Sequence, residues 1–340
     1  MAMLPIRTTI KDIARESGVN ISTVSRALNG VYGVHPETRE HVLQIADRLH
    51  YRPNRVARGL VTGRSHSVAL VVSDIRNPYF AEVARGAEDA ARAAGSDLVL
   101  CNSDLNADKQ MEYVQSLTEK QVDGILMNSV AELNPKQQDQ LLNCGVPIVL
   151  LNRSGVKQTF STVSADNEAG GAIAAEYLLR LGHRNIAHIT GPKRHGNMTD
   201  RAKGFLRVVR AGRPAKKVVL IHGMNSFDGG YDMTRALLAE HPDVTAIFTA
   251  NDVMAFGSIR ACLDVGRRVP EDISLIGFDN VQMSSIVHPP LTTIHQPKYE
   301  IGQAAVETLL RHIRSAGKPV AEHLLLSVEL IERQSCRSLL

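Results

Sequence analysis

Residues 8–30 of the chain read TTIKDIARESGVNISTVSRALNG. Apolar side chains recur there at a spacing of three and four positions, at Ile10, Ile13 and Ala14. This spacing places them on one face of a helix. Gly18 is suited to end that helix, because glycine adopts the left-handed conformation at little cost. Asn20 is suited to begin a second helix, since its side-chain oxygen can accept a free backbone N–H. The stretch therefore predicts two short helices joined by a tight turn.

The second predicted helix, residues 21–29, has two different faces. One face is apolar and suited to burial, with Val24, Ala27 and Leu28. The opposite face is exposed in this interpretation and carries Ile21, Ser22, Ser25 and Arg26. Small, hydroxyl-bearing and guanidinium side chains in the first turns of a helix fit the major groove of DNA. The pattern favours a helix-turn-helix with residues 21–29 as its recognition helix, and the alternative is a helical hairpin inside an ordinary core.

The net charge of the chain is concentrated around these two helices. Residues 1–62 hold nine Lys and Arg residues against five Asp and Glu, whereas the remaining residues hold 30 of each kind. The first 62 residues therefore carry the whole excess of +4. Neutralising the phosphates of a nucleic acid requires positive charge, so its location agrees with a DNA-binding unit.

A third helix is predicted over residues 36–49. Pro36 suits the first helical position. The helix also has an apolar stripe that can pack on the other two helices and complete a small three-helix unit. This stripe consists of Val42, Ile45, Ala46 and Leu49. Pro53 then interrupts regular structure. The segment 54–60 is too short to hold a helix alone, and Gly59 within it costs about another 1 kcal/mol. We expect this segment to be ordered only by contacts from outside it.

These segments resemble a known family. The runs TIKDIARESGVNISTVSRALNG (residues 9–30) and VHPETREHVLQIADRLHYRPNRVARGL (residues 34–60) look like the DNA-binding headpiece of LacI/GalR bacterial transcription regulators. The resemblance implies a set of DNA-contacting residues, namely Thr9, Asn20, Ile21, Ser22, Thr23, Ser25, Arg26, Asn29, Tyr51, Asn54, Arg55, Ala57, Arg58 and Leu60. It also implies a hinge that folds as a helix on the operator and inserts Leu60 into the minor groove. Alternatively, Leu60 is a linker leucine that packs on the next domain.

Length and composition limit the class of protein. At 340 residues the chain exceeds one typical domain, and its hydrophobic content of 44% supports sizeable cores. The four cysteines are far apart and form no CxxC pair, which argues against a zinc site and fits free thiols in a reducing compartment. The first residues contain no apolar signal-peptide core, and no run is long enough to span a bilayer. We expect a soluble, cytoplasmic protein without a membrane partner.

From Ser67 onward the chain alternates strand-like and helix-like segments. The strand-like runs are almost wholly apolar, as in parallel strands covered on both faces, and lie at 67–73, 97–101, 123–128, 147–152, 185–190, 218–222, 244–250 and 273–278. This alternation predicts α/β doubly wound architecture. About 270 residues is long for one such sheet, so two lobes are expected. The region resembles the type I periplasmic-binding-protein fold, which forms the core of LacI/GalR regulators.

The predicted fold class is therefore a small all-α helix-turn-helix domain followed by a two-lobed α/β core of doubly wound parallel sheets. We expect a headpiece over residues 1–53 and a hinge and linker over 54–65. The two stretches at 291–297 and 323–334 are interpreted as the chain crossing between lobes. The first lobe is expected to comprise residues 66–182 and 294–321, and the second lobe residues 183–291 and 324–340.

A ligand in an open α/β sheet binds at the carboxyl ends of the strands. The polar and aromatic residues there resemble the effector-contacting positions of the family, and we expect them to converge on one cleft between the lobes. They are Asp74, Asn77, Tyr79, Phe80, Asn152, Arg153, Asp166, Arg201, Asn251, Asp279 and Gln296. Alternatives remain for some of them: Asp74 and Asn251 could only cap the following helices, and Phe80 could belong to the core. Asp252 is interpreted as structural.

The leading interpretation is a ligand-controlled transcription regulator, expected to act as a repressor. A homodimer is expected to bind a near-palindromic operator, and the effector is expected to be a carbohydrate. A sugar-binding transport receptor shares the fold but requires export, and an α/β enzyme lacks a GxSxG, P-loop or GxGxxG motif after a strand. No catalytic residue, metal site or cofactor is expected. Whether the effector releases or promotes DNA binding stays open.

Overall fold

The computed structural model describes residues 8–52, 63–128, 134–153, 159–192, 196–211, 217–315 and 320–340. The chain divides into two compact units, residues 1–65 and 66–340. The predicted hinge residues 54–62 lie outside the described residues. Among the described residues, no helix is both long and apolar enough to cross a membrane.

The first unit contains the three predicted helices, α1 (Ile10–Ser17), α2 (Ile21–Asn29) and α3 (Pro36–Arg48). Gly18 ends α1 in the left-handed conformation, with φ of 67°. The Asn20 side chain begins α2 by accepting the Thr23 backbone N–H at 2.8 Å. All three helices contribute to one apolar core, made of Ile13, Val24, Ala27, Val42, Ile45 and Ala46. Local capping and helical periodicity therefore predicted this unit correctly.

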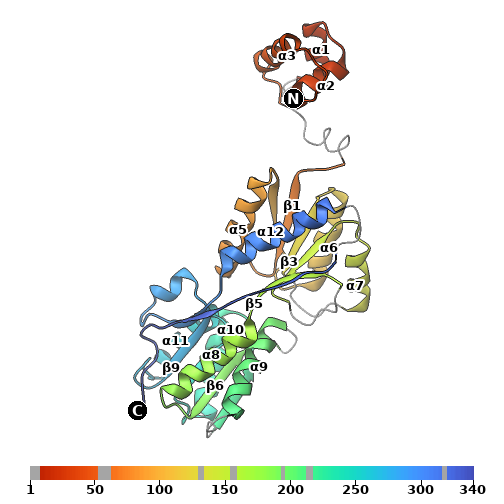
Figure 1. Cartoon of the computed structure of the whole chain (residues 1–340). Coiled ribbons are helices and arrows are strands. Elements are labelled where there is room, and N and C mark those ends of the chain that lie inside the picture. Colours follow the sequence, from red (N-terminus) through yellow and green to blue (C-terminus); the bar gives the residue numbers. More distant parts are fainter. Residues whose placement is uncertain are drawn as a thin grey trace, which may run out of the picture. The chain divides into compact units, whose positions relative to one another are not determined.

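The first lobe of the second unit is a parallel sheet covered on both faces (Figure 1). Its strand order is β11-β5-β4-β3-β1-β2, with bounds β1 (Ser67–Val72), β2 (Asp97–Asn102), β3 (Gly124–Asn128), β4 (Ile148–Leu151), β5 (Ser161–Ala165) and β11 (His323–Leu326). Alternate strand residues point to opposite faces. One face packs on α5 (Tyr79–Ala93) and α12 (Lys298–Arg314), and the other on α6 (Ala107–Glu119) and α7 (Pro135–Leu142).

The second lobe repeats this layered arrangement. Its strand order is β12-β10-β9-β8-β6-β7, with bounds β6 (Asn185–Thr190), β7 (Lys217–His222), β8 (Ala246–Thr249), β9 (Ser274–Asp279), β10 (Thr292–His295) and β12 (Glu329–Ile331). Only β12 runs antiparallel to its neighbour among the pairs described. One face packs on α10 (Phe227–Glu240) and α11 (Asp252–Asp264), and the other on α8 (Asn167–Arg180) and α9 (Gly196–Ala211).

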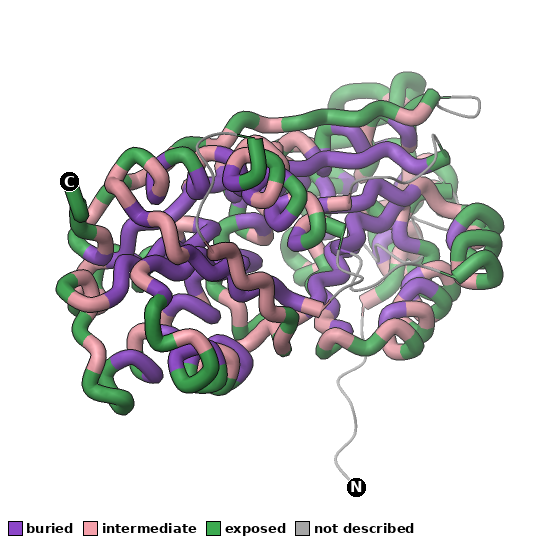
Figure 2. The backbone as a smooth tube through the Cα atoms, turned by 90° about the horizontal axis from the view of Figure 1, so that it is seen from below, coloured by how far each residue is buried: buried purple, intermediate pink, exposed green. Residues whose placement is uncertain are grey.

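All eight predicted strands are present, but the expectation that they are covered on both faces holds only for the inner strands and fails for the edge strands β2 and β7. Figure 2 shows buried strands inside the two lobes and exposed helix surfaces outside them. β1 and β3 are buried almost throughout, whereas Val99 and Leu100 of the edge strand β2 are 39% and 42% exposed. β7, an edge strand of the second sheet, is half-buried over most of its length. An edge strand has a neighbour on one side only, so apolar composition alone does not place it inside.

The lobe boundaries expected from the sequence need correction. α8 packs on α9 in the second lobe, so the first crossing lies at about 166 and not at 182. β10 pairs with β9, which keeps residues 292–295 in the second lobe. β11 pairs with β5, so residues 323–326 belong to the first lobe and the last crossing follows them. Strand pairing and helix packing, which are long-range contacts, set these boundaries.

Candidate nucleic-acid interface and ligand-binding cleft

The exposed face of α2 is the candidate nucleic-acid interface. Ile21 is 45% exposed, and Ser22 and Arg26 are exposed as well. On the opposite face Val24 and Ala27 are fully buried against α1 and α3. Burial of one face fixes the rotation of the helix about its own axis, so the polar face points to solvent. The helix can therefore enter a major groove without rearranging the core.

Asn20 organises the start of this helix. Its Oδ1 accepts three donors: the Thr23 backbone N–H, the Thr23 hydroxyl at 2.9 Å and the Ser22 hydroxyl at 2.6 Å. At the other end, the Asn29 amide donates to the Ser25 backbone oxygen at 2.9 Å. The hydroxyls of the first turn are thereby oriented before any ligand arrives.

The other predicted DNA-contacting residues are placed as follows. Thr9 is exposed at the start of α1, and its hydroxyl donates to Asp12 Oδ2 at 2.7 Å. Tyr51 is half-buried and packs against the headpiece core. The remaining predicted contacts, which are Asn54, Arg55, Ala57, Arg58 and Leu60, lie outside the described residues.

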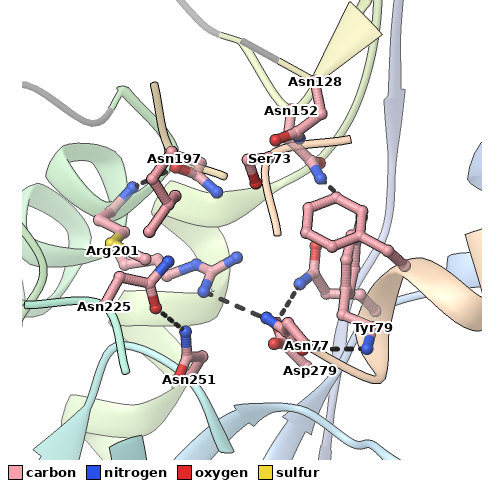
Figure 3. Close-up of a pocket in the computed structure, with 14 residues that line it drawn as sticks. Ser73, Asn77, Tyr79, Asn128, Asn152, Asn197, Arg201, Asn225, Asn251 and Asp279 are labelled. Atoms are coloured by element: carbon pink, nitrogen blue, oxygen red, sulfur yellow. Dashed lines mark hydrogen bonds and ion pairs between the residues drawn. The ribbon is translucent and has the colours of Figure 1, made fainter. Parts of the chain in front are cut away.

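A cleft lies between the two lobes of the second unit (Figure 3). It is lined by Ser73, Asn77, Tyr79, Phe80, Leu105, Asn128, Asn152, Asn197, Met198, Arg201, Asn225, Asn251, Asp279 and Gln296. These residues follow the carboxyl ends of strands in both sheets or begin the helices after them. The topology thus brings polar groups from distant parts of the chain to one place.

Eight of the eleven predicted ligand-contacting residues line this cleft. They are Asn77, Tyr79, Phe80, Asn152, Arg201, Asn251, Asp279 and Gln296. Asn251 also caps α11 by accepting the Met254 N–H at 2.9 Å, so the capping alternative is correct without removing Asn251 from the cleft. Phe80 likewise belongs to the first-lobe core while lining the cleft.

Three predicted residues are not among those that line the cleft. Asp74 Oδ2 instead accepts from the Arg76 guanidinium at 2.8 Å. Asp166 caps α8 through the Ala169 N–H at 2.9 Å. Arg153 follows Asn152 directly, and only Asn152 lines the cleft. Strand ends position a loop, but the local turn decides which of its side chains faces the ligand.

Arg201 is the buried cation of the cleft, with 2% of its surface exposed. Its Nε donates to Asn167 Oδ1 at 2.9 Å, and its Nη1 donates to the Ala250 backbone oxygen. The guanidinium lies 3.6 Å from the centre of the Phe278 ring. Burial lowers the pKa of Arg201, and Asp279 opposes that change. These contacts hold the guanidinium in one orientation.

Asp279 is the buried anion that faces Arg201, with Oδ1 3.7 Å from Nη1. The same oxygen accepts from Gln296 Nε2 at 2.5 Å. Burial raises the pKa of Asp279, while the neighbouring Arg201 guanidinium opposes the rise. The backbone of Asp279 has φ of 111°, a conformation that side chains other than glycine rarely adopt. Such a strained residue is retained only where surrounding contacts hold it.

Amide groups supply most of the remaining polar surface. Asn152 donates to the Tyr79 hydroxyl at 2.6 Å, and Asn251 donates to Asn225 Oδ1 at 2.5 Å. Burial raises the pKa of Tyr79, so the phenol stays protonated. Two buried acceptors that line the cleft, Asn152 Oδ1 and Gln296 Oε1, have no hydrogen-bond partner among the described residues. A donor on a bound ligand can satisfy such groups.

Six residues of the lining were not predicted from the sequence. They are Ser73, Leu105, Asn128, Asn197, Met198 and Asn225. Ser73 and Asn225 follow β1 and β7, and Asn128 ends β3, so applying the strand-end rule to every strand would have found these three. No sequence signal marks Leu105, because its place depends on how its loop folds.

One other prediction concerns a residue beside the cleft. Asp252 is fully buried and accepts from the Val281 N–H, the Ser284 hydroxyl and the Thr293 hydroxyl, in agreement with a structural role. Among the described residues, no group of His, Cys, Asp and Glu is arranged to hold a metal ion.

Comparison with known proteins identifies both units. Residues 9–54 match the model of bacterial regulatory proteins of the lacI family, and residues 65–334 match that of periplasmic binding proteins and the sugar-binding domain of the LacI family. The ribose operon repressor of Halalkalibacterium halodurans is 38% identical over 306 residues, covering 90% of each chain.

Solved structures agree with these matches. The Lac repressor dimer bound to operator and the anti-inducer ONPF is 28% identical, with a TM-score of 0.87, over 98% of this chain and 100% of that one. A LacI-family regulator from Enterococcus faecalis V583 with bound ribose is 34% identical, with a TM-score of 0.73, over 81% of this chain and 100% of that one. With a helix-turn-helix unit, a two-lobed core and matches along nearly its whole length, this chain belongs to the LacI family of ligand-controlled, DNA-binding transcription regulators.

Proposed function

We propose that this protein is a transcriptional repressor whose binding to operator DNA is controlled by a neutral monosaccharide held in the cleft between its lobes. The observation that carries the proposal is the lining of that cleft. It combines amide side chains, one mutually paired Arg–Asp couple and two aromatic rings.

The amides match a polyhydroxylated ligand. Six asparagines line the cleft, namely Asn77, Asn128, Asn152, Asn197, Asn225 and Asn251, together with Gln296. Each amide both donates and accepts hydrogen bonds, as each sugar hydroxyl does. The unpartnered oxygens of Asn152 and Gln296 can each accept a hydroxyl proton.

Charge in the cleft favours an uncharged ligand. Arg201 and Asp279 are both more than 95% buried and face each other, so their charges largely compensate. A carboxylate or phosphate ligand would require an unmatched cation, and a cationic ligand would require an unmatched carboxylate. The fixed hydrogen-bond donors and acceptors of the cleft instead suit hydroxyl groups, which carry no net charge.

Aromatic side chains further narrow the ligand class. The rings of Tyr79 and Phe80 line the cleft and pack edge to face, with centroids 5.1 Å apart. Such rings can contact the apolar C–H face of a sugar. The regulator from Enterococcus faecalis V583 holds ribose and the transcriptional regulator CelR holds cellobiose, so D-ribose is the first ligand to test.

The DNA-binding part of the proposal assigns α2 to the major groove of an operator half-site. One recognition helix reads one half-site, so we propose a homodimer on a near-palindromic operator. The protein acts in the cytoplasm, where the DNA is, and catalyses no reaction. A gel-shift assay at physiological salt separates this function from those of a transport receptor and an enzyme.

A pair of matched substitutions tests the ligand site. Operator sequences are first selected from random DNA, and operator affinity is then measured with and without D-ribose, D-xylose and D-glucose. Asp279→Asn should weaken sugar binding at least tenfold, because it removes the partner of Arg201. Asp166→Asn should leave it within twofold, since Asp166 caps α8 outside the cleft. Equal effects of the two substitutions, or failure of every neutral sugar to bind, would contradict the proposal.

A further inference from the structure

The segment that leaves β10 for α12 contacts Asp279 twice. Gln296, at the start of this segment, donates to the Asp279 carboxylate at 2.5 Å. Lys298, two residues later, donates from Nζ to the backbone oxygens of Asp279 at 2.8 Å and Asn280 at 3.0 Å. One crossing between the lobes thus holds both the side chain and the backbone of the residue that faces Arg201.

Lys298 is unusually deeply buried for a lysine. Only 1% of its side-chain surface is exposed, although lysine is among the residues least often buried. Its ammonium also lies 3.4 Å from Glu82 Oε2 on α5. Three acceptors, two backbone oxygens and one carboxylate, therefore surround the ammonium and compensate for its removal from water.

The backbone that Lys298 contacts is strained. Asp279 and the next residue, Asn280, both have positive φ, 111° and 54°. Non-glycine residues in such conformations cost on the order of 1–3 kcal/mol each and persist only where neighbouring contacts hold them. Both carbonyl oxygens of the turn lie within hydrogen-bond distance of one ammonium, which favours this conformation over a relaxed one.

The ammonium also connects this turn to the first lobe. Asp279 ends β9 of the second lobe and Asn280 follows it, whereas Glu82 lies on α5 of the first. α5 and α12 lie side by side in Figure 1, and a Cβ at Gly86 of α5 would come within 2.0 Å of the Tyr299 backbone oxygen. Such close packing leaves α5 and the start of α12 little freedom to move apart.

We propose that Lys298 is a positioning residue for ligand recognition: it fixes the strained Asp279–Asn280 turn and links it to α5 of the first lobe. The ammonium does not line the cleft. It acts through Asp279, whose carboxylate keeps its place beside Arg201 only while the backbone of the turn is held. The proposal rests on the assignment of the cleft as the ligand site.

Substitution of Lys298 by Met, an unbranched side chain that is one atom shorter and carries no charge, tests this role in the full-length protein. Amide exchange is measured without ligand, and D-ribose affinity is measured by calorimetry. Lys298→Met should raise the exchange rates of Asn280 and Val281 at least tenfold and the dissociation constant for D-ribose at least tenfold. Glu82→Gln should raise the same exchange rates and the dissociation constant for D-ribose two- to fivefold. This second variant tests the proposal if Lys298→Met does not fold.

The matched control is Arg184→Met. Arg184 also donates to two backbone oxygens, those of Leu179 and His183, and neither residue lines the cleft. This variant should bind D-ribose within twofold of the wild type. The proposal is overturned if Lys298→Met and Arg184→Met weaken D-ribose binding equally, or if the former leaves exchange at Asn280 and Val281 unchanged. If the wild type binds no sugar, the proposed function fails, and the exchange measurement alone decides whether Lys298 holds the turn.

Discussion

Replacing Asn20 by Ala and by Asp separates two roles that this residue is expected to have, in folding and in DNA binding. Asn20 Oδ1 accepts the Thr23 N–H at 2.8 Å and orients the hydroxyls of Ser22 and Thr23. Alanine removes this acceptor, and loss of an N-cap typically costs about 1 kcal/mol. A change of that size is roughly fivefold in the opening equilibrium of the first turn.

Asn20→Asp should keep the helix capped but weaken DNA binding. The aspartate carboxylate can accept the same N–H, and a negative charge at a helix N-terminus stabilises the helix by about 0.3–1 kcal/mol. The same charge would face the phosphates of bound DNA. Two like charges about 4–6 Å apart repel by roughly 1–4 kcal/mol, as the effective dielectric constant ranges from that of bulk water to that of a protein surface.

Two measurements on the full-length protein distinguish these effects. Amide exchange at Thr23 should rise about fivefold in Asn20→Ala and stay at or below the wild-type rate in Asn20→Asp. Operator affinity in a gel-shift assay at low salt should fall at least fivefold in Asn20→Asp, and the loss should shrink as salt increases.

Asn106 provides the matched control, because it caps α6 of the core in the same way by accepting the N–H groups of Asp108 and Lys109. Asn106→Asp should leave operator affinity unchanged. Exchange at Thr23 that rises as much in Asn20→Asp as in Asn20→Ala would refute the capping argument. Unchanged operator affinity in Asn20→Asp would refute the placement of Asn20 beside phosphates.

Three other predictions concern DNA reading, assembly and coupling. Arg26→Ala should weaken operator binding by about 1–3 kcal/mol if the exposed guanidinium reads a base, and equal losses on operator and random DNA would make it a phosphate contact instead. A fragment of residues 63–340 should be a dimer by light scattering at micromolar concentration, and a monomer would show that the core does not carry the dimer contact. Gly59→Ala should favour a helical hinge by up to about 1 kcal/mol and tighten operator binding, with amide exchange across residues 54–62 slowed by operator and altered by effector. Equal amide exchange with and without operator and effector would show that residues 54–62 do not couple effector binding to DNA binding.

The helix-turn-helix could be predicted from the sequence because its determinants are local. Gly18, Asn20 and Pro36 each act within one turn of their own position, and the structure places all three as expected. The spacing of apolar residues then selects which face is buried, as Val24 and Ala27 demonstrate. Such effects depend on neighbours a few residues away, so one sequence is enough to read them.

The sheet order and lobe boundaries were beyond the reach of local patterns. β5 reads STVSA, which is polar in composition, yet all five residues are buried because β4 and β11 cover both of its edges. The partner strand β11 arrives from more than 150 residues away along the chain. Whether a strand is central or lies at an edge depends on such distant partners, and composition does not contain that information.

In the ligand site, too, some residues could be predicted from the sequence and others were placed only by tertiary contacts. The rule that ligands bind at strand ends, together with the resemblance to LacI/GalR regulators, predicted Asn77, Arg201 and Asp279 as members of one cleft. Which side chain of each loop faces inward was decided by tertiary contacts, and Asp166 turned to cap α8 instead. The sequence by itself determined the elements and the chemistry available at their ends. Only the tertiary structure placed Lys298 against the Asp279 backbone, because that contact joins residues on different lobes and no short-range preference specifies it.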